Sequence, residues 1–144
     1  MNKIINFDMD GTIANLYGVD GWLDDLNNKS ERPYQLAKPL INLSSLARIL
    51  NRLQKNGYQV NIISWLAKNS NEDFDSRVTI AKREWLKKHL PSVSWNKVSI
   101  VAYGTPKSTC GNGILFDDEE RNRKEWNGIA YDANNIIEVL KGLD

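Results

Sequence analysis

Short apolar runs that each end in a polar cluster or loop constrain the fold of this chain more than any other feature. They are rich in β-branched residues and mostly do not alternate with polar residues, which is typical of strands buried on both faces of a sheet. They cover residues 4–7, 60–63, 98–102, 114–116 and 129–131. Because parallel strands need a crossover between them, the runs predict an α/β fold.

Helical patterns lie between the runs. Apolar residues recur at helical spacing in residues 43–53, 74–85 and 136–143, and residues 119–126 form a shorter, more polar pattern. Gly57 lies where a C-terminal cap of the first helix is expected, and Pro91 stops the second. Asp132 or Asn134 is expected to cap the third. The alternation predicts one parallel sheet with helices on both faces.

The length of 144 residues fits a single domain over residues 1–144. The 19 lysines and arginines nearly balance 18 aspartates and glutamates, so there is no strong nucleic-acid signal, although a local basic site is compatible with this balance. The single Cys110 and the single His89 exclude a disulfide framework and a multi-His metal site. No apolar run is long enough to span a membrane, and a reducing cytoplasm is the expected location.

Residues 13–39 interrupt the alternation between the first strand and the first strong helix. They include Tyr17, Trp22 and Tyr34, and they are too few to form a domain with its own core. We interpret them as a small cap over one end of the sheet. The alternative is a long surface loop.

Polar side chains with related chemistry follow the predicted strands. In open parallel sheets, ligands bind outside the carboxyl ends of the strands. Clustered carboxylates suit Mg²⁺, and a lysine with small hydroxyl groups suits a phosphoryl group. The residues expected at this edge are Asp8, Asp10, Thr12, Ser64, Lys107, Asp117 and Asp118.

The spacing of the first two carboxylates has a chemical reason. Asp8 ends a buried strand and is held rigidly, while Asp10 reaches the same side and Gly11 lets the chain turn away. One carboxylate can then attack phosphorus while the other handles the proton of the leaving group. The alternatives are a simple turn or a fragment of a calcium loop, but the glutamate that such a loop needs is missing.

These motifs resemble those of the haloacid dehalogenase (HAD) superfamily of phosphohydrolases. Residues 7–12 match its Asp-x-Asp motif, residues 62–64 its strand-end Ser or Thr, and residues 115–118 its acidic pair. Lys107 is the choice for its lysine, with Lys82 as the rival. The resemblance implies a single Rossmann-like domain that hydrolyses phosphate esters.

The resemblance also implies a role for each residue. Asp8 is the nucleophile, and Asp10 acts as general acid and base. Phosphoryl oxygens are expected to be held by Ser64, Lys107 and Thr12. The Mg²⁺ ligands are expected to be Asp8, the backbone carbonyl of Asp10, and Asp117 or Asp118, directly or through water.

A closer resemblance is to the 5'(3')-deoxyribonucleotidase branch, which implies a nucleoside monophosphate as substrate. Residues 81–91 are similar to its Lys-x-x-Trp-Val segment, and residues 114–121 to its Leu-Ile-Asp-Asp stretch. This chain departs from the branch at residues 64–66, where Thr-Ser-Pro is usual, and in its shorter cap. The alternatives are a HAD phosphatase for another small phosphate ester, and a receiver-like or non-catalytic phosphate-binding module.

Overall fold

A five-stranded parallel sheet forms the centre of the computed structural model, which describes residues 3–144. The strand order is β5-β4-β1-β6-β7. The strands are β1 (Ile4–Phe7), β4 (Gln59–Trp65), β5 (Lys97–Val101), β6 (Ile114–Phe116) and β7 (Ile129–Tyr131). Every pair of neighbouring strands is parallel, which confirms the predicted α/β fold.

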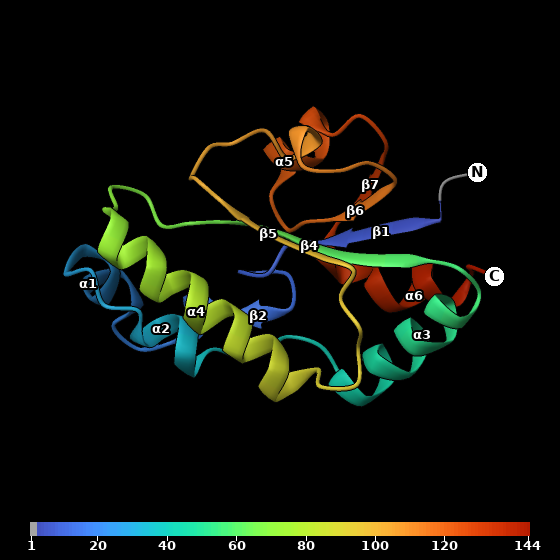
Figure 1. The fold of residues 1–144 in the computed structure, drawn as a ribbon, viewed down its shortest axis with the longest axis horizontal. Coiled ribbons are helices and arrows are strands. Elements are labelled where there is room, and N and C mark those ends of the chain that lie inside the picture. The colour runs from blue at the N-terminus through green and yellow to red at the C-terminus, as the bar shows by residue number, and fades with distance from the viewer. Residues whose placement is uncertain (1–2) are drawn as a thin grey trace.

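Helices cover both faces of the sheet, but unequally. Figure 1 shows α3 (Leu43–Lys55), α4 (Glu72–His89) and α6 (Ile136–Lys141) on one side and the short α5 (Glu120–Glu125) on the other. On the first side, Phe7 belongs to a buried cluster that includes side chains from all three helices. The second side has a smaller buried cluster, built on Ile63, Leu115 and Trp126.

The predicted helix ends are mostly confirmed. Gly57 follows α3 with φ +94°, a conformation that favours glycine after a helix C-terminus, and α4 ends two residues before Pro91. The predicted capping of the last helix is wrong, because neither Asp132 nor Asn134 caps α6. A 3₁₀ turn, η3 (Ala133–Asn135), leads directly into α6, and no side chain caps either element.

Residues 13–39 form a small unit at one end of the sheet. Its two ends pair as the short antiparallel strands β2 (Ala14–Asn15) and β3 (Lys38–Pro39). Between them lie the 3₁₀ turn η1 (Leu16–Gly18) and the helices α1 (Trp22–Asn27) and α2 (Arg32–Leu36). In Figure 1, α1 and α2 lie beyond the end of the sheet toward which β1 points.

Side-chain contacts from α4 hold this unit in place. The guanidinium of Arg77 donates to the backbone oxygen of Lys29 at 2.9 Å and to Glu31 at 2.8 Å. The indole of Trp85 donates to the backbone oxygen of Ala37 at 2.8 Å. Both ends of α2 are therefore tied to α4. No helix among residues 3–144 is both long and apolar enough to cross a membrane.

Candidate active site

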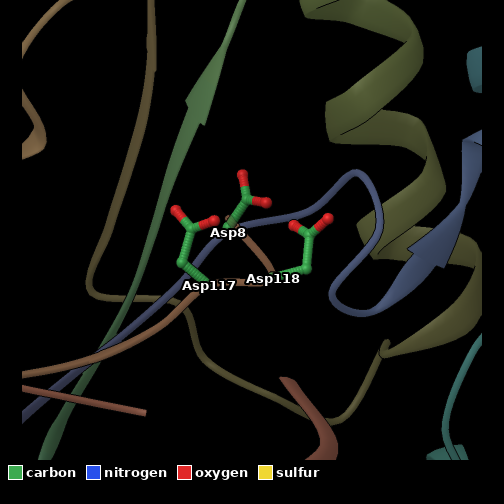
Figure 2. A group of neighbouring side chains, drawn as sticks. All are labelled: Asp8, Asp117 and Asp118. Atoms are coloured by element: carbon green, nitrogen blue, oxygen red, sulfur yellow. The ribbon is translucent and has the colours of Figure 1, made fainter. Parts of the chain in front are cut away.

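Three carboxylates meet where β1 and β6 end. Asp8 follows β1, and Asp117 and Asp118 follow β6; the pairing of Phe7 with Phe116 brings the two strand ends level. One carboxylate oxygen from each lies within 4.8 Å of the others. Figure 2 shows the three side chains pointing the same way, with Asp8 between the other two. The predicted gathering of these residues at one sheet edge is present in the structure.

A buried lysine neutralises part of this charge. Lys107, from the 3₁₀ turn η2 (Lys107–Thr109), donates to Asp8 at 2.8 Å and to Asp117 at 2.7 Å. Burial alone would lower the pKa of Lys107, but the two carboxylates outweigh it and raise the pKa above its usual value. The ammonium therefore stays charged. Asn122, which the sequence reasoning missed, also donates to Asp117 at 3.1 Å.

Thr12 and Gly11 set the orientation of the other carboxylates. The hydroxyl of Thr12 lies 3.1 Å from both Asp8 and Asp118 and accepts a bond from the Asp118 backbone N–H at 3.1 Å. Gly11 has φ +81°, and a side chain there would collide with the Asp118 carboxylate. The glycine is thus needed for close approach as well as for the turn. Thr12 is buried, and its hydroxyl contacts two of the three carboxylates.

A second buried lysine, Lys82, forms an ion pair with Asp10. Lys82 of α4 donates to Asp10 at 3.0 Å, to Ser64 Oγ at 2.7 Å and to the backbone oxygen of Trp65 at 2.7 Å. Its side chain is 1% exposed, and the ring of Tyr34 lies 5.0 Å from the ammonium. Both candidate lysines of the sequence therefore lie at this edge: Lys107 pairs with Asp8 and Asp117, and Lys82 pairs with Asp10.

The sequence does carry a signal for Lys82. It lies four residues after Val78 and three before Trp85, so it falls on the buried stripe of the helix. A lysine at such a position needs a partner, since an unpaired buried charge is costly. The partner, Asp10, lies 72 positions away along the chain.

The four carboxylates Asp8, Asp10, Asp117 and Asp118 can carry more negative charge than Lys82 and Lys107 balance. Burial, with the charge of Asp8, raises the pKa of Asp118 to about 8 and that of Asp117 to about 6. Burial also raises the pKa of Asp10, against the lowering effect of Lys82. Three convergent oxygen donors with surplus negative charge fit a small divalent cation such as Mg²⁺.

A pocket of about 320 Å³ opens above these residues. Asp8, Asp10 and Lys107 line it, whereas Ser64 is fully buried. Two aromatic pairs also line it. On the side of residues 13–39, the rings of Tyr17 and Trp22 meet edge to face, with their centroids 5.0 Å apart. On the core side, the ring centroids of Trp65 and Tyr103 are also 5.0 Å apart. The pocket is therefore lined by charged residues, Asp8, Asp10 and Lys107, which we call the charged floor, and by the two aromatic pairs.

No family model and no curated protein matches this chain. Among solved structures, the chain is similar to D,D-heptose 1,7-bisphosphate phosphatase from Burkholderia thailandensis, with a TM-score of 0.55 and 12% sequence identity. The match covers 99% of this chain and 100% of that chain. The two chains share a fold, the Rossmann-like α/β domain that the HAD resemblance implied.

Asp118→Asn is expected to remove a pH-dependent loss of stability when a chelator keeps divalent cations out. Folding raises the pKa of Asp118 from 3.8 to about 8, so between these values the folded state holds a proton that the unfolded state has released. The free energy of unfolding of the wild type therefore falls as the pH rises through this window. The variant keeps the contributions of Asp117 and Asp10, whose pKa values are also raised, and its Tm should exceed that of the wild type by a few degrees at about pH 8.

The measurement is a series of melting curves from about pH 5 to about pH 8.5. The exposed Asp24→Asn is the matched control, and its curve should run parallel to that of the wild type. If the Tm of Asp118→Asn followed pH in parallel with the wild type, the raised pKa of Asp118 would be contradicted.

Proposed function

We propose that this chain is a Mg²⁺-dependent phosphomonoesterase of the HAD superfamily, with Asp8 as nucleophile. The observation that carries the proposal is the environment of Asp8. Its carboxylate faces the pocket, is oriented by Lys107 and Thr12, and lies two residues from a second carboxylate, Asp10, that lines the same pocket.

The reaction follows from these positions. A carboxylate oxygen of Asp8 attacks phosphorus, the bond from phosphorus to the leaving oxygen breaks, and Asp10 gives its proton to that oxygen. Water then attacks phosphorus of the aspartyl-phosphate, Asp10 takes the proton of the water, and inorganic phosphate leaves with Asp8 regenerated. The raised pKa of Asp10 supports a proton donor at this place.

The two lysines have distinct tasks in this proposal. Lys107 lines the pocket and binds phosphoryl oxygens while it holds Asp8. Lys82 orients Asp10 and also donates to Ser64 Oγ. Ser64 is fully buried and does not line the pocket, so in this proposal it acts on the phosphoryl group indirectly, by holding Lys82. Thr12 acts on the phosphoryl group indirectly, by fixing the carboxylate of Asp8.

Mg²⁺ would be held by Asp8, Asp117 and Asp118, together with the backbone carbonyl of Asp10 that the HAD resemblance implies. When bound, it neutralises the charge that develops on the phosphoryl group. The oxygen donors and the raised pKa values of Asp117 and Asp118 support this assignment.

A nucleoside monophosphate is the proposed substrate. Its phosphate suits the charged floor, and its base suits the aromatic pairs Tyr17–Trp22 and Trp65–Tyr103, which line the pocket. A receiver-like module is disfavoured because its phosphorylated aspartate belongs on the third strand, and β5 carries none. The free Cys110 is compatible with the predicted cytoplasmic location.

The first test is phosphate release across nucleoside monophosphates, sugar phosphates and phosphoserine, with Mg²⁺ and with excess chelator. Wild-type protein should release phosphate only with Mg²⁺, because the carboxylates otherwise repel the dianion. Asp8→Asn should lose about 10³-fold or more in kcat, since an amide is a poor nucleophile. Asp20→Asn, an exposed position, is the control. Phosphate release that is unchanged in excess chelator would contradict the proposed Mg²⁺ dependence.

Asp10→Asn should affect substrates according to their leaving groups. The backbone of residue 10 is unchanged, so binding should largely persist, but the proton for the leaving oxygen is lost. We expect kcat for an alkyl phosphate to fall by about 10² to 10⁴-fold. p-Nitrophenyl phosphate, whose leaving group needs little protonation, should lose much less. An equal loss on both substrates would remove the acid role from Asp10.

Trp22→Ala should raise KM for a nucleoside monophosphate and leave p-nitrophenyl phosphate nearly unaffected. Stacking of an aromatic side chain on a base contributes about 1–3 kcal/mol, or roughly 5- to 150-fold in affinity. Leu23→Ala is the matched control, because Leu23 lines the same wall without an aromatic face. An equal loss on both substrates with a lowered Tm would mean that Trp22 only packs against Tyr17.

A further inference from the structure

Two exposed cations flank the Trp65–Tyr103 pair, outside the charged floor of the pocket. The ammonium of Lys68 lies 5.9 Å from the ring centroid of Tyr103, and the guanidinium of Arg121 lies 5.8 Å from that of Trp65. Both side chains belong to exposed residues, and Lys68 also lines the pocket. We call these four residues the basic rim.

The two cations of the basic rim are largely free of carboxylate partners. Within residues 3–144, no carboxylate lies within ion-pair distance of Lys68. Arg121 reaches only Glu125, at 3.5 Å and on the exposed surface. The buried Lys82 and Lys107 differ, because each is bound to carboxylates of the reaction centre. The rim therefore has positive charge that the reaction centre does not use.

Trp65 connects the rim to the reaction centre. The ammonium of Lys107, which contacts the nucleophile, lies 5.8 Å from the same ring that Arg121 approaches. The indole N–H of Trp65 donates to the backbone oxygen of Thr105 at 2.8 Å, which fixes the ring. A substrate whose phosphate lies at Asp8 has Trp65 beside it, and the rest of that substrate can extend along the ring to the rim cations.

We propose that the basic rim binds a second, non-reacting phosphate of the substrate; this rests on the proposed function. Arginine and lysine are the side chains that recognise phosphate, and the aromatic pair between them and the floor suits the nucleoside part. Glu119 also lines the pocket, but within residues 3–144 it forms no ion pair with either rim cation. The second phosphate belongs either to a nucleoside bisphosphate or to the phosphodiester next to the end of a strand.

The test compares one nucleoside as its 5'-monophosphate, as its 3',5'-bisphosphate and as the first residue of a 5'-phosphorylated dinucleotide. Calorimetry gives Kd for each with chelator present, and phosphate release with Mg²⁺ gives kcat/KM. Wild-type protein should favour the bisphosphate over the monophosphate by about 10-fold, and salt should reduce this ratio. The variant Lys68→Gln/Arg121→Gln should bring the ratio close to one.

Lys124→Gln is the matched control. Lys124 lies on α5 like Arg121 but pairs with Glu120 at 2.8 Å, so removing its charge should leave the ratio unchanged. A ratio of one in the wild type, or an equal drop in Lys124→Gln, would overturn the proposal. A matching preference for the dinucleotide would support the rim and identify a strand end as the source. A preference for the bisphosphate alone would support the rim and identify a small metabolite.

The two proposals fail in different ways. Phosphate release from the monophosphate together with a Kd ratio of one would overturn the basic rim and leave the phosphatase function standing. No phosphate release from any of the three compounds, with the Kd ratio intact, would overturn the function and leave an anion-binding rim.

Discussion

The ion pairs of Lys107 hold the site together. Its ammonium lies between Asp8 and Asp117, with a side chain only 2% exposed, and so bridges the ends of two central strands. Without it, two carboxylates would face each other in a largely buried place, where an uncompensated charge is strongly unfavourable. The same contact aims the carboxylate of Asp8 at the pocket. The ion pairs of Lys107 thus neutralise carboxylate charge and also orient the proposed nucleophile, Asp8.

A second lysine gives Asp10 a different environment from Asp8, although the two lie two residues apart. Lys82 joins Asp10 to Ser64 and approaches Tyr34 of α2, so one side chain links the core domain to the unit of residues 13–39. The different environments suit different roles, because a nucleophile must stay ionised while a proton donor must be able to hold its proton. Because Tyr34 contacts the ammonium that binds Asp10, the unit of residues 13–39 also contributes to the environment of Asp10.

Most of the fold could be predicted from the chain, because its signals are local. Apolar β-branched runs and helical stripes predicted the five strands and the helices α3 to α6, and Gly57 predicted the end of α3. The capping of α6 was predicted wrongly at Asp132 and Asn134, since a preceding 3₁₀ turn is not marked by any periodicity. The strand order and the pairing of β2 with β3 depend on contacts between distant residues, which local patterns do not encode.

For the site, the sequence by itself determined which groups gather at the sheet edge, because a parallel sheet brings the carboxyl ends of its strands together. Asp8, Asp10, Asp117 and Asp118 follow from that rule. Only the tertiary structure decided how the charges pair: Lys107 with Asp8 and Asp117, and Lys82 with Asp10. Sequence spacing is silent on this point, since the partners lie up to 99 positions apart and the pairing depends on which side chains the packed helix and loop bring within hydrogen-bond distance.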